Sequence, residues 1–402
     1  MKITSYFDFF QPTAIKSGAG TRILAPNSIL ELGGKRPILF SDKGLTNAGL
    51  TQEIIDLFER CPGIELAGVF DDIEQDAKSS IINKAIQYYK DTNADSLISL
   101  GGGSVMDSVK AVKWAIHNKV SDIGTAVMGT VLDSADKIKP FPIPHVSIPT
   151  TAGTGSEVSA GAVIYNELLG VKCNLFNPFI SANIALLDPD LTVVLPPKIT
   201  AFTGMDALTH AVEAYFSPKS NSFTDALALH STRLITDNLK TAVHDGQNLA
   251  ARSNMLQAST MAIQSFLGAS GAYPVHNLAH AFGAKYHIPH GLANAVFLPI
   301  VMTNMPNHYL EKIKGFAEIL GVKAISEEPQ VLLRSCIDEI DRIREEIHLP
   351  ADFSEYNIDP SDIPGLIPLV QSDPIALTFR IPDAVIKAVS EQVIVGKKLH
   401  QA

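Results

Sequence analysis

The sequence has 402 residues and a formal net charge of −10. Because proteins that bind nucleic acid need a positive surface, this charge argues against a nucleic-acid partner. Hydrophobic residues make up 46% of the chain and charged residues 18%, which excludes a disordered protein and, at this length, predicts two domains.

The cysteines and the N-terminus indicate where the protein works. Cys61, Cys173 and Cys336 are scattered without C-x-x-C spacing, which fits a reducing compartment and no disulfide framework. The N-terminal segment MKITSYFDFFQPTAIKSG is too polar and interrupted for a signal peptide. Nowhere does an apolar run reach the length of about 18 residues that a membrane span needs. We therefore expect a soluble cytoplasmic protein with no membrane partner.

The first half of the chain alternates short apolar runs with helical patterns. The predicted strands are 37–42, 64–70 and 96–100, and the predicted helices are 51–60, 81–89 and 105–116. Further strands are expected at 145–148, 162–165 and 184–187. Short apolar strands separated by helices predict a parallel, Rossmann-like sheet covered on both faces.

The pattern changes after Pro196-Pro197, where few β-rich runs remain. The predicted helices are 207–216, 222–239, 249–266, 277–282 and 292–302, and the last third continues in the same way with several prolines. We therefore place a domain boundary near Leu195. Residues 1–195 form an α/β domain, and residues 196–402 form an all-α domain.

A glycine turn follows the predicted strand 96–100. Gly101-Gly102-Gly103-Ser104 precedes a predicted helix, so free backbone N–H groups and the positive helix end lie where an anion can bind. Glycine permits close approach of a ligand because it has no Cβ. The letters do not match the G-x-G-x-x-G fingerprint, and a tight turn without any ligand remains an alternative.

Two further features favour a dinucleotide. The segment Pro149–Glu157, PTTAGTGSE, places hydroxyls and small residues after another strand, and two such loops at strand carboxyl ends suggest one cleft. Asp42 follows the first predicted strand, where a carboxylate accepts hydrogen bonds from ribose hydroxyls and repels a 2′-phosphate. A surface turn or helix cap is the competing interpretation of Asp42.

The helical half holds a cluster of residues typical of metal ligands. Asp206 and His210 share one helix face at i, i+4 spacing, and a later stretch contains His276, His280, His287 and His290. A single histidine is more often a satisfied core or surface residue. Several imidazoles and one carboxylate on apolar helices need a common partner, and Zn²⁺ or Fe²⁺ fits that set. The spacing alone does not identify which three of the histidines would bind the metal.

With these pieces in order, the chain resembles the iron-containing (type III) alcohol dehydrogenases over nearly its whole length. The matching stretches are GGGSVMDSVKA, PTTAGTGSEVS, LLDPDLT, TGMDALTHAVEAYFS and HNLAHAFGAKYHIPHGLANAVFLP. The resemblance implies a dehydroquinate synthase-like architecture, in which an α/β nicotinamide-dinucleotide domain precedes a helical metal-binding and substrate domain. It also implies a homodimer or a larger homo-oligomer.

The resemblance also implies which residues form the site. The implied metal ligands are Asp206, His210, His276 and His290. His280 would lie near nicotinamide and substrate and handle the proton, whereas His287 matches a variable position. The implied cofactor contacts are Asp42, Gly102, Gly103, Ser104, Asp107, Thr150, Thr151, Thr154 and Lys172. The aspartate at position 42 is similar to that of the NAD-preferring members.

The implied activity is hydride transfer between a small primary alcohol or aldehyde and NAD(H), with a divalent metal as Lewis acid. The metal is expected to be Fe²⁺, with Zn²⁺ as the alternative. Glycerol dehydrogenases and maleylacetate reductases are the nearer alternatives. More distant ones are a dehydroquinate synthase-like lyase, which needs basic residues that the Asp206 segment lacks, and a binding protein with a structural metal.

Two segments depart from the family pattern. Relatives often carry Asn-Pro after the second strand, whereas this chain has Gln75-Asp76-Ala77, which affects cofactor affinity. Near the C-terminus a usual Thr-Asn-Pro-Arg is replaced by Thr378-Phe379-Arg380-Ile381, which alters the substrate-side wall or its packing.

Overall fold

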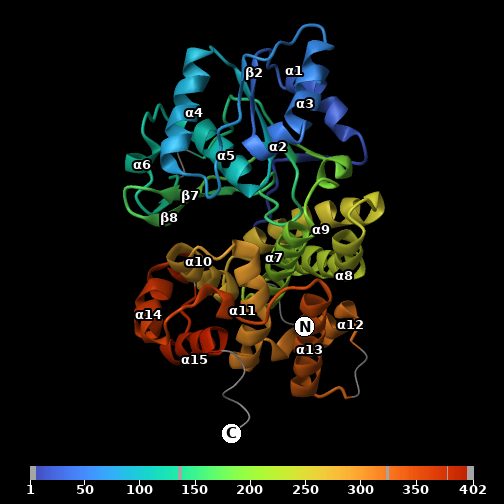
Figure 1. Cartoon of the computed structure of the whole chain (residues 1–402), viewed down its shortest axis with the longest axis vertical. Coiled ribbons are helices and arrows are strands. Elements are labelled where there is room, and N and C mark those ends of the chain that lie inside the picture. Colours follow the sequence, from blue (N-terminus) through green and yellow to red (C-terminus); the bar gives the residue numbers. More distant parts are fainter. Residues whose placement is uncertain (1–5, 135–137, 323–325, 378, 396–402) are drawn as a thin grey trace. The chain divides into compact units, whose positions relative to one another are not determined.

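The structure is a computed structural model that describes residues 6–134, 138–322, 326–377 and 379–395 (Figure 1). The chain divides into two compact units, one from Phe10 to Leu195 and one that joins the segment ending at Phe9 to the residues from Pro196 onward. The first unit is α/β and the second is helical, so the predicted fold class is confirmed. Thr378 and the ends of the predicted domains, residues 1–5 and 396–402, lie outside the described residues.

A six-stranded parallel sheet forms the centre of the α/β unit. Its strand order is β1 (Ala14–Ser17), β9 (Ile184–Leu187), β6 (His145–Pro149), β4 (Ser96–Gly101), β2 (Pro37–Phe40) and β3 (Gly68–Phe70). Every residue of β2, β4, β6 and β9 is buried. Because both faces of the sheet are covered, these strands are buried along their whole length. The polar residues within β4 and β6 pair with one another, as Ser99 Oγ does with Ser147 Oγ at 2.7 Å and with His145 Nε2 at 3.0 Å.

Successive residues of the central strands face two different cores. Ile38 and Leu97 belong to one cluster, while their neighbours Leu39 and Ile98 belong to the other. Figure 1 shows helices on both sides of β2. The helices of this unit are α1 (Ala25–Glu31), α2 (Lys43–Asn47), α3 (Leu50–Glu59), α4 (Ser79–Asp91), α5 (Gly103–His117) and α6 (Ile123–Ala126). The doubly covered sheet that the sequence predicts is therefore present.

A second, three-stranded sheet differs from the prediction. It contains β5 (Thr130–Leu132), β8 (Val171–Phe176) and β7 (Gly161–Asn166), with β7 antiparallel to β8. The strand expected at 162–165 is present as β7, but it lies in this second sheet and not in the parallel one. The prediction also missed β1, β5 and β8, and it extended β3 too far, since only Gly68–Phe70 pairs.

The described part of the second unit is built from α-helices joined by loops and single-turn helices. The α-helices are α7 (Pro197–Phe216), α8 (Ser222–His244), α9 (Leu249–Gly268), α10 (Pro274–Tyr286), α11 (His290–Asn304), α12 (Ile313–Leu320), α13 (Pro329–Glu346), α14 (Ile363–Ser372) and α15 (Asp383–Val395). Helix α7 begins about ten residues before the prediction because Pro197 occupies its first position, where a proline loses no hydrogen bond.

The N-terminal segment belongs to this helical unit and not, as the sequence suggested, to the α/β unit. The rings of Phe7 and Phe9 pack on Phe223 of α8, with ring centroids 5.8 and 5.7 Å apart. Contacts of this kind are made between residues more than two hundred positions apart, so local sequence patterns do not reveal them.

Among the described residues, the helices include none that combines the length and the apolar character required to cross a membrane.

Candidate metal centre

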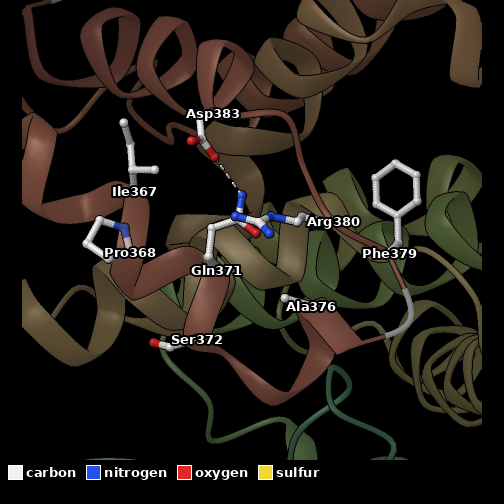
Figure 2. A pocket seen from close by; sticks show the side chains of 8 residues that line it. All are labelled: Ile367, Pro368, Gln371, Ser372, Ala376, Phe379, Arg380 and Asp383. Atoms are coloured by element: carbon white, nitrogen blue, oxygen red, sulfur yellow. Dashed lines mark hydrogen bonds between the residues drawn. The ribbon is translucent and has the colours of Figure 1, made fainter.

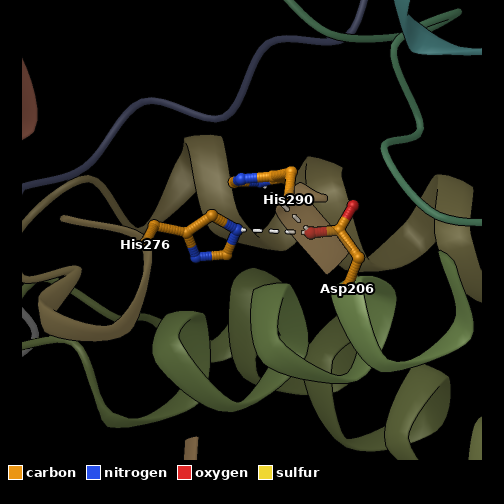
Figure 3. A group of neighbouring side chains, drawn as sticks. All are labelled: Asp206, His276 and His290. Carbon is orange, nitrogen blue, oxygen red and sulfur yellow. Dashed lines mark ion pairs between the residues drawn. The ribbon is translucent and has the colours of Figure 1, made fainter. Parts of the chain in front are cut away.

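Three of the predicted metal ligands converge from three helices of the helical unit (Figure 3). Asp206 comes from α7, His276 from α10, and His290 is the first residue of α11. Their ligand atoms all lie within 4.8 Å of one another. Asp206 Oδ1 is 3.4 Å from His290 Nε2 and 3.7 Å from His276 Nε2. A carboxylate oxygen and two imidazole nitrogens so placed fit a divalent transition metal.

Glu213 holds His276 in its orientation. Its Oε2 lies 2.5 Å from His276 Nδ1, and its Oε1 accepts a hydrogen bond from the backbone N–H of Val275 at 2.6 Å. The Nε2 atom of His276 is therefore the one turned toward Asp206. A carboxylate behind a ligating imidazole is the usual way in which proteins fix the tautomer and ring plane of a metal-binding histidine.

Asn294 joins the same three residues from one turn beyond His290 on α11. Its Nδ2 donates to Asp206 Oδ1 at 2.7 Å and lies 3.2 Å from His276 Nε2 and 3.3 Å from His290 Nε2. The sequence analysis named neither Glu213 nor Asn294. Helical spacing was the available signal, because Glu213 follows Asp206 by seven residues and Asn294 follows His290 by four.

The charges of this cluster are strongly coupled. Burial would raise the pKa of Asp206, but the imidazoles of His210, His290 and His276 together hold it well below its usual range. Burial would lower the pKa of His276, but the carboxylates of Glu213 and Asp206 outweigh it and raise that pKa to about 9. The carboxylates of Glu213 and Asp206 therefore favour positive charge on the group that lies between them.

The other predicted histidines occupy different positions. His210 lies one turn after Asp206, outside the group of three, and its ring stacks on that of His276 with centroids 4.5 Å apart. His280 has its ring centroid 5.3 Å from that of His290, and its Nδ1 lies 3.2 Å from Asp373 Oδ2. His287 is exposed and ends α10 in the left-handed conformation.

In the α/β unit the two small-residue loops lie directly against each other. A Cβ added to Gly102 would lie 3.2 Å from the Thr151 side chain, and one added to Gly103 would lie 2.8 Å from Thr154 Cγ2. Thr150 N donates to Gly101 O at 3.0 Å. The two loops therefore meet where β4 ends and α5 begins, as expected if they line one cleft.

The remaining predicted cofactor residues also make protein contacts. Asp42 Oδ1 caps α2 by accepting from Leu45 N at 3.0 Å. Asp107 accepts from Ser156 Oγ at 2.5 Å and from Val163 N at 3.0 Å, and so fastens the second loop to α5. Ser104 accepts from the backbone N–H of Asp76, and Lys172 forms an ion pair with Asp76.

A cavity of about 740 Å³ lies in the C-terminal part of the helical unit (Figure 2). It is lined by residues of α14, the single-turn helix Pro374–Leu377, and α15, among them Gln371, whose amide bonds to Asp383. Phe379 and Arg380 also line it, whereas Asp206, His276 and His290 do not.

Comparison with known proteins identifies the family of the chain. Residues 12–189 match the profile described as iron-containing alcohol dehydrogenase, and residues 200–382 match that of the C-terminal part of the same family. A choline dehydrogenase of Bacillus subtilis is 32% identical, over 93% of this chain and 92% of its own. An NAD-dependent methanol dehydrogenase of Bacillus methanolicus is 30% identical, over 89% and 91%.

A crystal structure of a 1,3-propanediol oxidoreductase superposes with a TM-score of 0.88 at 31% identity, and the match covers 97% of this chain and 100% of that one. Both halves of the sequence, and both units of the fold, are thus accounted for by one family. The chain belongs to the iron-containing alcohol dehydrogenase family.

Proposed function

We propose that the chain interconverts small primary alcohols and their aldehydes at a centre formed by Asp206, His210, His276 and His290. Its class, a metal-dependent alcohol dehydrogenase that uses NAD(H), follows from its family. Choline, methanol and 1,3-propanediol, which appear in the names of its relatives, each carry a primary hydroxyl group. The convergence of Asp206, His276 and His290 from three helices is the observation that carries the proposal.

The four ligands would hold Fe²⁺, or alternatively Zn²⁺, because aspartate and histidine bind both ions. When bound, such an ion supplies Lewis-acid stabilisation of the charge that develops on the alcohol or carbonyl oxygen. Asp206 contributes the negative charge of the site, Glu213 keeps Nε2 of His276 available, and Asn294 orients the Asp206 carboxylate. His210 lies one turn after Asp206 on α7 with its ring stacked on that of His276, and it is the proposed fourth ligand.

His280 is the proposed proton-handling residue. Asp373 lies at its Nδ1, so that its Nε2 remains available to take the proton from the alcohol or return it. The side chains of His280 and Asp373 are 10% and 12% exposed, which limits access of bulk water to the transferred proton. The cavity beside Phe379 and Arg380 is the proposed place where this chain differs from its relatives on the substrate side.

The α/β unit is proposed to hold NAD(H). Its pyrophosphate would lie on the free N–H groups at the start of α5, where the helix end is positive and glycine leaves room. The ribose would meet Asp42, which favours NAD over NADP. The proposed cofactor contacts are Asp42, Gly102, Gly103, Ser104, Asp107, Thr150, Thr151, Thr154 and Lys172, with Asp107 acting through the loop that it fastens.

We further propose a homodimer or larger homo-oligomer in the cytoplasm. The scattered cysteines support a reducing compartment, since Cys173 and Cys336 are buried and unpaired.

Metal analysis of single variants tests the proposed centre. Asp206→Ala, His210→Ala, His276→Ala and His290→Ala should each lose most of the bound metal and the aldehyde-dependent oxidation of NADH, because each removes one ligand. His287→Ala is the matched control, since His287 is exposed at the end of α10, and it should keep both.

Two results would contradict the proposal. Retention of metal by His290→Ala together with its loss in His287→Ala would show that the ligands are wrongly assigned. If the wild-type protein binds its metal tightly but none of the aldehydes or ketones tested supports the oxidation of NADH, the protein would instead be a binding protein with a structural metal.

A further inference from the structure

The turn Gln75-Asp76-Ala77 lies against the glycine turn of the proposed dinucleotide site. The backbone N–H of Asp76 donates to Ser104 Oγ at 3.1 Å. Ser104 is the second residue of α5 and directly follows Gly102 and Gly103. A residue outside both small-residue loops is therefore fastened to the positive end of the helix on which cofactor phosphates are proposed to bind.

The backbone at Asp76 is held in an unusual conformation. Asp76 and Ala77 have φ angles of 71° and 50°, in the left-handed region that aspartate tolerates and alanine rarely adopts. The N–H of Tyr165 on β7 lies within hydrogen-bonding distance of both carbonyls, 3.1 Å from that of Asp76 and 3.2 Å from that of Ala77. Backbone strain that the surroundings maintain in this way is typical of functional sites.

The same contacts bring Asp76 to a lysine. Tyr165 pairs with Lys172 across the β7–β8 ladder, and Lys172 Nζ lies 2.9 Å from Asp76 Oδ1. The Lys172 side chain is 23% exposed and that of Asp76 is 39% exposed, so both remain reachable by a ligand. The backbone contacts of the turn therefore place Asp76 next to Lys172, and the two side chains meet in an ion pair.

We propose that Asp76 weakens the binding of the dinucleotide phosphates by pairing with Lys172 beside the glycine turn. The inference depends on the proposed function, because it takes the start of α5 as the phosphate site. The Asp76 carboxylate acts in two ways. It repels the anionic pyrophosphate, and it pairs with the Lys172 ammonium group, which would otherwise attract the pyrophosphate. The consequence is weaker binding and faster release of NAD(H).

Calorimetric titration of NADH into the full-length, metal-loaded protein tests this inference. Asp76→Asn removes the charge and keeps a residue that tolerates the left-handed conformation, and it should lower the Kd for NADH by roughly three- to tenfold. Added salt should weaken NADH binding more steeply in this variant than in wild type, since one more cation meets the phosphates. In the Asp76→Asn background, the additional change Lys172→Met should abolish the gain in affinity for NADH.

Glu74→Gln is the matched control. It removes the same charge two residues away, from a side chain that pairs with Lys78 and is 54% exposed, and it should leave the Kd unchanged. Equal Kd values for wild type and Asp76→Asn would overturn the inference and leave the proposed function standing. An equal gain in Glu74→Gln would overturn it as well, because net charge would then be the cause. Absence of NADH binding in both proteins would overturn the inference and the proposed function together.

Discussion

Glu213 is the residue on which the orientation of His276 depends. Its side chain is 1% exposed and is bonded to His276 Nδ1 and to the N–H of Val275 at the start of α10. Glu213→Gln keeps the shape but removes the negative charge that makes the His276 imidazole a better ligand. We expect the affinity for metal to fall by about 10- to 100-fold while the fold is retained.

Competition with a coloured chelator measures that loss directly. Glu65→Gln is the control, since Glu65 is an exposed side chain of the α/β unit that pairs only at 3.5 Å with Arg36, and it should leave the metal affinity unchanged. A metal affinity in Glu213→Gln within about twofold of wild type would show that Glu213 serves only to cap α10.

Residue-level chemistry was partly predictable from the sequence. The choice of His276 and His290 among the later histidines came from the family resemblance, but Asp206 and the histidine cluster itself could be singled out because they lie at helical spacing on otherwise apolar helices. The partnership of Glu213 with His276 could not, because it joins residues 63 positions apart. For the same reason the sequence did not reveal that Asp107 fastens a loop through Ser156 and Val163.

At the level of elements, α11 approaches α7 too closely for a side chain at one position. A Cβ added to Gly291 would lie 2.2 Å from the carbonyl oxygen of Phe202 on α7, and backbone cannot rotate aside as a side chain can. We expect Gly291→Ala to push α11 away from α7 and so to move His290 away from Asp206. The predicted cost is about 1–3 kcal/mol of stability, with a parallel loss of bound metal.

Gly365→Ala on α14 is the matched control. No atom lies within 4 Å of the added Cβ, so this variant should keep its bound metal. Its free energy of unfolding should stay the same or rise by up to about 1 kcal/mol, because alanine has a higher helix propensity than glycine. Thermal melting and metal content of both variants decide the matter. Indistinguishable variants would mean that the α7–α11 contact does not position His290.

Elements with their own periodicity were predictable, and elements defined by their neighbours were not. The fully buried strands β4 and β6 and the helix α5 were found from apolar runs and helical spacing. The edge strand β1 has the sequence AIKS and is largely exposed, and β8 mixes lysine, cysteine and asparagine. Pairing with β9 and β7 makes these segments strands, and such partners are invisible in a local window.

On the scale of the whole molecule, the proposed metal ligands and the proposed dinucleotide loops are divided between two units. Asp206 and the histidines belong to the helical unit, and the glycine turn belongs to the α/β unit. The sequence located this division near Leu195 because strands cease there. The sequence assigned the residues just before Phe10 to the wrong unit, because aromatic contacts with Phe223 attach this segment to the helical unit.

The stability of the α/β unit should depend on pH through a buried lysine. Lys113 on α5 is 1% exposed, and its Nζ donates to Ser181 O at 2.7 Å and to Phe179 O at 3.2 Å. Burial lowers the pKa of Lys113 from 10.5 to about 7. Between pH 7 and 10.5 the unfolded chain therefore holds a proton that the folded chain lacks, so the contribution to stability rises with pH in this window and is constant below it.

The single tryptophan, Trp114, is the next residue on α5, so its fluorescence reports urea unfolding of this unit. From pH 7 to pH 9, the free energy of unfolding of wild type should increase relative to that of Lys113→Met, by at most about 1.4 kcal/mol per pH unit. Other titrating groups are common to both proteins and cancel in the difference. Lys84→Met, at an exposed position of α4, is the control for the loss of a lysine side chain. Parallel pH curves for wild type and Lys113→Met would mean that Lys113 keeps its proton in the folded protein, paired with the two carbonyls as an ammonium.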